Sequence, residues 1–211
     1  MPNSARSSAR FLEFFPRLAR TLALLVVGAF LAAGAAGCGY NEIIDRDEDV
    51  KAAWAEVQNQ YQRRSDLVPN LVKVVKGNAA FEKSTLESVV EARAKVAGVK
   101  VDQSVIDDPA KLKQFEEAQQ GLTGALSRLM VVVERYPDLK ATEGFRDLQA
   151  QLEGTENRIA VARKRYIENV AEYNKVVERF PTSIGSSIRG KAVRSTFSVA
   201  PGVEKAPDVQ L

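Results

Sequence analysis

The sequence of 211 residues contains no histidine and only one cysteine. Without histidine, neither a Ser-His-Asp triad nor a histidine-ligated metal site can form. A single cysteine excludes an internal disulfide framework and a cysteine-rich zinc site. Any enzymatic chemistry would have to use carboxylates, lysines or hydroxyl groups, so the sequence predicts no cofactor.

Outside the N-terminus, the chain has no excess of charge of either sign. The formal net charge is +3, from 30 basic and 27 acidic residues. Residues 1–38 contain four arginines and one glutamate, so the whole excess lies there. The remaining residues are neutral overall and lack the basic footprint of a nucleic-acid binder. No nucleic-acid partner is therefore predicted.

One long apolar run lies near the N-terminus, where residues 21–41 carry no charge. Its apolar centre is Thr21–Ala36, and arginines precede it. A membrane-spanning helix needs about 20 apolar residues, whereas a signal peptide combines a basic start, a shorter apolar run and a small-residue end. Residues 1–38 fit both descriptions, and their arginines favour the cytoplasmic side. The segment is therefore predicted to be a signal or membrane anchor.

Cys38 stands where this run ends, after Ala35, Ala36 and Gly37. Small residues before a cysteine resemble a bacterial lipobox, in which the cysteine is diacylated and becomes the mature N-terminus. Ala35 departs from that pattern, which usually has leucine or another aliphatic residue there. The alternative is a free cysteine at the end of an uncleaved membrane helix. Both alternatives tether the body, residues 39–211, to the non-cytoplasmic side of a bacterial membrane, periplasmic or extracellular, at the inner or the outer membrane.

The body repeats apolar residues at alternating steps of three and four. This period predicts long amphipathic helices, which are stable only where other helices cover their apolar stripes. The expected fold is all-α: an antiparallel three- to four-helix bundle with long helices over residues 39–181. Trp54, Tyr166 and Tyr173 fall on the stripes and should be buried. Helices are expected over about residues 45–75, 79–96, 109–135 and 141–180, with a turn over residues 136–139.

Prolines mark the breaks in this pattern. Pro69 lies inside the first helix and should bend it, because proline lacks a backbone donor. Pro109 suits the first position of a helix, with Asp108 as its N-cap. Residues 182–211 follow Pro181 without a helical period, so they are expected to form a flexible or irregular tail.

Polar residues interrupt the apolar stripes of the first and last helices. Buried polar groups need hydrogen-bond partners, so these residues are expected to form one buried polar layer that sets the helix register. A ligand contact site is the alternative. The residues of the expected layer are Arg63, Arg64 and Asp66 in the first helix and Thr155, Asn157 and Arg158 in the last.

Several motifs resemble the LemA family of bacterial membrane-anchored helical proteins. Three of them are the segments Gln60–Leu71, Tyr136–Lys140 and Glu153–Arg163. The resemblance implies an antiparallel helical bundle behind a membrane anchor, and the family has no assigned enzymatic activity. The family usually has a histidine where this chain has Phe81, which argues against metal or acid–base chemistry there. Residues 39–41, 50–54, 82–86, 91–94 and 126–134 also carry the resemblance.

Together these features predict a membrane-tethered, non-catalytic helical bundle that binds envelope proteins or organises membrane. The alternative is an enzyme, or a regulatory subunit of one, that uses Glu and Arg groups around Arg63, Glu153 and Arg158. Pairing of Glu153 with Arg158, or of either with Arg63 and Asp66, would favour the first function. A deep open cleft lined by these groups would favour the second.

Overall fold

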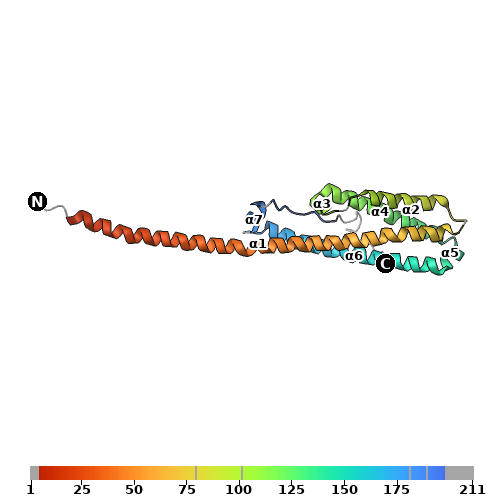
Figure 1. Cartoon of the computed structure of the whole chain (residues 1–211), viewed down its shortest axis with the longest axis horizontal. Coiled ribbons are helices and arrows are strands. Elements are labelled where there is room, and N and C mark those ends of the chain that lie inside the picture. The colour runs from red at the N-terminus through yellow and green to blue at the C-terminus, as the bar shows by residue number, and fades with distance from the viewer. Residues whose placement is uncertain (1–4, 79, 101, 181, 189, 198–211) are drawn as a thin grey trace, which may run out of the picture. The chain divides into compact units, whose positions relative to one another are not determined.

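The computed structural model describes residues 5–78, 80–100, 102–180, 182–188 and 190–197 (Figure 1). Side chains are described from residue 41 onward, except those of residues 184 and 188. Every regular element in this part of the chain is a helix, so the all-α prediction is confirmed. The helices are α1 Ala5–Lys76, α2 Lys83–Gly98, α3 Ser104–Asp107, α4 Pro109–Val133, α5 Pro137–Ala141, α6 Glu143–Glu178 and α7 Thr182–Ile188.

The chain divides into two compact units. The larger unit contains residues 46–174 and 193–211, and the smaller contains residues 1–45 and 175–192. Helices α1 and α6 each contribute to both units.

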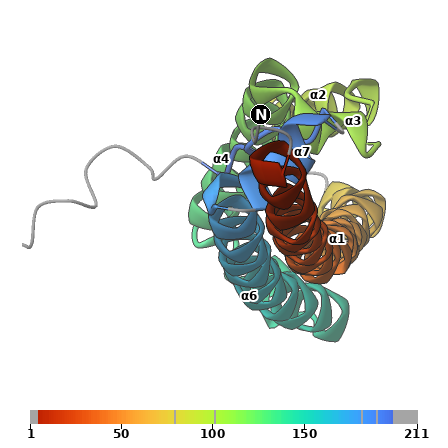
Figure 2. The same cartoon turned by 90° about the vertical axis from the view of Figure 1, so that its left-hand side faces the viewer.

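In the larger unit, α1 and α6 run in opposite directions. Asn169 on α6 donates to the carbonyl oxygen of Asp49 on α1, whereas Glu156, earlier on α6, meets Arg64, later on α1. Helix α2 returns along α4 in the same way, since Glu82 at its start pairs with Arg135 just after α4 ends. Figure 2 views these helices nearly end-on, with α2 and α4 on one side and α6 on the other.

Helix α1 continues through Pro69, where a bend was expected. Proline has no N–H to give to the carbonyl oxygen four residues earlier, which belongs to Ser65. Arg93 of α2 supplies the missing donor, because its Nε donates to the Ser65 carbonyl oxygen at 3.1 Å. An arginine from the neighbouring helix thus replaces the lost backbone hydrogen bond.

The short connections between the long helices are more ordered than the sequence predicted. Asp108 caps α4 as expected, with its side chain accepting from the backbone N–H groups of Ala110 and Lys111. The connection before it contains the helix α3. The expected turn at Tyr136–Leu139 contains most of the helix α5, because Pro137 favours a first helical position as Pro109 does.

The apolar stripes are buried largely as predicted. Trp54, Tyr166 and Tyr173 are each at most 1% exposed, which confirms their expected burial. The last helix was expected to run to about residue 180, but α6 ends at Glu178, and Phe180 beyond it is 76% exposed. Periodicity holds only while the helix continues.

The expected irregular tail contains ordered structure that the sequence pattern missed. In the smaller unit, residues 182–188 form α7, and Ser186 Oγ donates to the carbonyl oxygen of Val177. Residues 193–197 belong to the larger unit, where Phe197 is buried. Residues 198–211 lie outside the described part of the chain.

The predicted anchor, residues 1–38, is only partly covered by the structure. Thr21–Ala36 and Cys38 fall within α1, but their side chains are outside those described. Among the described residues, no helix combines the length and the apolar content needed to cross a membrane. Membrane anchoring and lipidation of Cys38 therefore stay predictions.

Candidate functional site

Arg64 is the centre of a polar layer in the larger unit. Its side chain is 2% exposed. Nη1 donates to Thr123 Oγ1 at 2.8 Å and to Glu156 Oε2 at 3.0 Å. Nη2 donates to the side-chain and backbone oxygens of Gln119, at 2.6 Å and 3.2 Å. One guanidinium group therefore joins α1, α4 and α6.

The structure places only part of the expected layer in the interior. Arg64 and Thr155 are buried, but the Thr155 hydroxyl donates to the Gln151 carbonyl oxygen of its own helix and does not reach Arg64. The other four residues are exposed, so their predicted burial was wrong. A helix turns by about 100° per residue, which carries the neighbours of an inward residue toward solvent. The exposed residues are Arg63, Asp66, Asn157 and Arg158.

The actual partners of Arg64 are Gln119, Thr123 and Glu156, none of which belongs to the layer expected from the sequence. Gln119 is 4% exposed and lies four residues after Phe115 on the buried face of α4. Ala118, one residue earlier, is only half-buried. A glutamine at helical spacing within an apolar stripe was the signal that could have identified the layer.

The Arg64 layer is suited to fixing the helices and not to turning over a substrate. Its guanidinium already has four acceptors from the same chain, which occupy its two terminal nitrogens. A buried arginine with several acceptors from neighbouring helices specifies their register, because a shifted helix would leave the charge unpaired.

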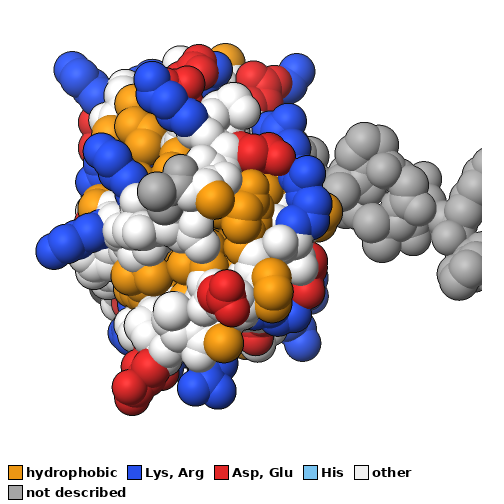
Figure 3. Space-filling model, turned by 90° about the vertical axis from the view of Figure 1, so that its right-hand side faces the viewer, with side chains coloured by type: hydrophobic (Ala, Val, Ile, Leu, Met, Phe, Trp, Pro, Cys, Tyr) orange, Lys and Arg blue, Asp and Glu red, His pale blue; other side chains and the backbone are white. Residues whose placement is uncertain are grey.

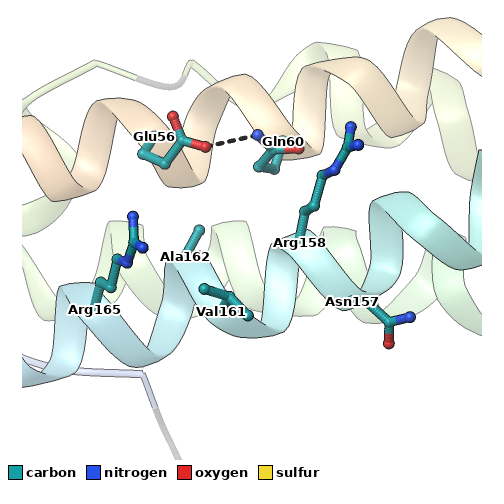
Figure 4. Close-up of a pocket in the computed structure, with 7 residues that line it drawn as sticks. All are labelled: Glu56, Gln60, Asn157, Arg158, Val161, Ala162 and Arg165. Atoms are coloured by element: carbon teal, nitrogen blue, oxygen red, sulfur yellow. Dashed lines mark hydrogen bonds between the residues drawn. The ribbon is translucent and has the colours of Figure 1, made fainter.

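A groove between α1 and α6 is lined by two arginines that, unlike the buried Arg64, lie at the surface (Figure 4). Arg158 and Arg165 line it from α6, with Val161 between them and 53% exposed. On the α1 side, Gln60 Nε2 donates to Glu56 Oε1 at 2.6 Å. Neither arginine forms an ion pair with any described residue. Their spacing of seven residues separates them by about 10 Å along the helix.

Glu153 and Arg158, whose pairing would have favoured the binding role, have different surroundings. Glu153 accepts from Gln149 Nε2 at 2.9 Å and lines a different groove, between α4 and α6. Arg158 lines the α1–α6 groove, and Asp66 accepts from Gln62 on its own helix. Glu153 and Arg158 thus do not line the same groove. In the described part of the chain, no group of three or more Asp, Glu or Cys residues is arranged to hold a metal ion.

The end of the larger unit that carries α5 shows only small hydrophobic patches, broken by charged side chains (Figure 3). A shallow hollow there includes Val74, Gly77, Asn78 and Leu139 in its lining. This end therefore presents no large continuous apolar surface in that view.

Comparison with known proteins places the chain in a family. A model of the LemA family matches residues 53–211, which is most of the chain. The chain belongs to the LemA family. The resemblance found in its motifs is thereby confirmed.

Two curated proteins illustrate how similar the chain is to its relatives. The magnetosome protein MamQ of Magnetospirillum gryphiswaldense is 28% identical over 167 residues, which cover 72% of this chain and 61% of MamQ. Protein LemA of Metamycoplasma hominis is 24% identical over 143 residues, which cover 68% of this chain and 61% of that protein. The chain thus spans about three fifths of the length of the curated relatives it matches.

Proposed function

We propose that this LemA-family protein is a membrane-tethered, non-catalytic helical bundle that binds a protein partner of the bacterial cell envelope. The observation that carries the binding role is the α1–α6 groove, where an exposed valine lies between two arginines that form no ion pair with any described residue. An exposed apolar side chain between free cations suits an acidic partner surface, because charge steers the encounter and apolar burial adds affinity.

The inferred scaffold is an antiparallel four-helix bundle made from α1, α2, α4 and α6. The opposite directions of α1 and α6, and of α2 and α4, support this arrangement. The Arg64 layer supports it as well, since it links three of the four helices. A rigid bundle presents the groove residues in fixed positions, which lowers the entropy lost on binding.

The inferred tether is the N-terminal segment, residues 1–38, with Cys38 as a lipidation site. The charge-free run over residues 21–41 supports the tether, and so does the name of the relative MamQ, a magnetosome protein. Two acyl chains would hold the body firmly on a membrane. Intact-mass analysis of the membrane fraction tests this: Cys38→Ser should remove the acyl mass. A mature protein that begins at residue 1 and carries no acyl mass would instead favour an uncleaved membrane helix.

Crosslinking of the full-length protein in its own membrane, with partners identified by mass spectrometry, tests the binding role. The double variant Arg158→Glu with Arg165→Glu should lose the partner that the wild-type protein captures. The double variant Arg128→Glu with Arg146→Glu is the matched control, because it makes the same charge change at exposed arginines that do not line the groove. Equal capture by both variants would contradict the groove's role.

The alternative, an enzyme or regulatory subunit that uses a Glu/Arg cluster, has a separate test. Two of the groups that it needs, Glu153 and Arg158, line different grooves. A turnover that Arg158→Ala abolishes, with no specific partner recovered, would contradict the non-catalytic binding role.

A further inference from the structure

The C-terminal segment 193–197 lies on the larger unit and inserts an aromatic ring into it. Phe197 is 4% exposed. Its ring centroid lies 5.3 Å from that of Tyr166 and 6.0 Å from that of Trp54. The Arg163 guanidinium lies 4.3 Å from the Phe197 ring centroid. A residue distant in sequence from both α1 and most of α6 thus completes an aromatic cluster.

Three residues earlier, Arg194 enters a pocket of opposite charge. Its side chain is 7% exposed and pairs with Asp47 of α1 at 2.9 Å and with Asp107 of α3 at 3.1 Å. The Arg194 guanidinium carbon also lies 5.0 Å from the ring centroid of Tyr173. Two carboxylates and an aromatic ring from three helices therefore select a cation at this position.

Between these two anchors, side chains of α6 bind the backbone of the segment. Asn174 donates to the carbonyl oxygen of Arg194 at 3.0 Å and accepts from its N–H at 2.9 Å. Tyr166 Oη donates to the Ser195 carbonyl oxygen at 3.1 Å. Val193 is 55% exposed, and Thr196 is exposed. Main-chain hydrogen bonds plus pockets for a few side chains are how proteins bind extended peptides.

The residues that contact this segment include Asp47, Trp54, Asp107, Tyr166, Tyr173 and Asn174, and we call the site that they form the cleft. We propose that the cleft is a recognition site for an extended peptide of the pattern Arg-x-x-aromatic. The chain's own residues 194–197 occupy it, and a segment of the same pattern from a partner protein takes their place. The cleft binds the arginine side chain, the backbone of the first two residues and the aromatic ring. The third residue, Thr196 in this chain, is exposed. The cleft is distinct from the α1–α6 groove, so an experiment that contradicts peptide binding in the cleft leaves the proposed groove interaction unaffected.

The covalent connection makes the chain's own segment a strong competitor. A tethered ligand acts at an effective concentration in the millimolar range for a short flexible link, so a free peptide of equal intrinsic affinity is mostly excluded. Weakening the chain's own segment should therefore increase the binding of a free peptide.

Trp54, the chain's only tryptophan, gives a direct readout because it contacts Phe197. In the full-length variant Phe197→Ala, the Trp54 emission should change. Addition of a synthetic peptide with the sequence of residues 191–197 should restore the wild-type emission in a saturable manner. The same peptide carrying Arg194→Ala should bind about tenfold more weakly or worse, because it lacks the guanidinium group that pairs with Asp47 and Asp107. Absence of saturable restoration would overturn the proposal, as would equal binding of the two peptides.

A second experiment does not depend on a substitution in the cleft. A protease site inserted after Gly190 in the otherwise unchanged full-length chain allows the segment to be cut after folding. The cut segment should remain bound, and a labelled peptide with the sequence of residues 191–197 should replace it while circular dichroism shows the helices intact. Replacement only when the helices unfold would show that the segment is a permanent part of the core, and would overturn the proposal.

Discussion

The two ends of the core of the larger unit are built in different ways. One end, which we call the aliphatic end, is mainly aliphatic with two phenylalanines, and all its members come from the helices and the short connections between them. The other end is aromatic: Trp54, Phe115 and Tyr166 lie together, and Phe197 of the C-terminal segment completes the cluster. The members of the aliphatic end are Val68, Leu71, Val75, Phe81, Val89, Val96, Leu122, Ala125, Leu126, Leu129, Val133, Leu139, Phe145, Leu148 and Leu152.

The two ends also differ in which segments of the chain contribute side chains to them. The aliphatic end closes with helices that are consecutive in the chain, and the Arg64 layer bounds it on α1 just before Val68. The aromatic end needs residues that return after α7. We therefore expect the aliphatic end to be self-sufficient and the aromatic end to depend on the segment 193–197.

Removal of the central ring of the aromatic end should have the largest effect. Trp54→Ala should lower the free energy of unfolding by about 3–5 kcal/mol, because a fully buried large side chain leaves both lost transfer energy and a cavity. Leu129→Ala makes the corresponding change at the aliphatic end and should cost about 2–5 kcal/mol. Chemical denaturation followed by circular dichroism measures both. A cost below about 1 kcal/mol for Trp54→Ala would contradict its central position.

Disruption of the layer between the two ends should have a smaller effect. Arg64→Leu should cost about 1–3 kcal/mol, because it leaves the buried Gln119 side chain without its arginine partner. Glu156 is 52% exposed, so its carboxylate can return to water. Arg63→Leu, one residue away and exposed, is the matched control and should change stability by less than about 0.5 kcal/mol. Equal effects of the two substitutions in the same denaturation assay would contradict the layer.

A double-mutant cycle tests the replacement of the hydrogen bond that Pro69 lacks. Arg93→Ala should cost about 1–3 kcal/mol in the wild-type chain, because the Ser65 carbonyl oxygen loses its donor. In a Pro69→Ala background, the alanine N–H can donate to Ser65, so the cost of Arg93→Ala should fall. Unfolding free energies of the four proteins give the coupling. Additive costs would show that Arg93 does not substitute for the missing N–H.

High pH should act mainly through the tyrosines near the aromatic end. Burial raises the pKa values of Tyr61, Tyr166 and Tyr173 above the ordinary value of 10.0. A raised native pKa gives stability that is complete below the unfolded pKa and is lost as pH rises above it, because the unfolded chain then releases the protons more readily. Unfolding free energy should therefore fall as pH rises above about 10, and Tyr166→Phe should reduce that fall. A pH slope unchanged in Tyr166→Phe would contradict the assignment.

How much the sequence could predict differs between the two ends. Aliphatic residues such as Leu71 and Leu129 recur at helical spacing, so a simple period predicts their burial. Arg64 was singled out as polar in an apolar stripe, and Gln119 in the stripe of α4 was a signal for the same layer. The partners of Arg64 lie on other helices, however, and the helical period does not show which residues pair across helices. Phe197 stands in a segment with no period, where burial depends on a cleft formed by distant helices. Its contribution therefore could not be predicted from the sequence.

Hydrogen exchange on the full-length protein tests most directly whether the aromatic end depends on the segment 193–197. Wild-type protein and Phe197→Ala should be compared under native conditions, where exchange reports local opening. Exchange should become faster in residues 47–57 of α1 and 163–174 of α6, while α2 and residues 122–133 of α4 stay unchanged. Equal acceleration at both ends, or none at either, would contradict the distinction between a self-sufficient aliphatic end and a segment-dependent aromatic end.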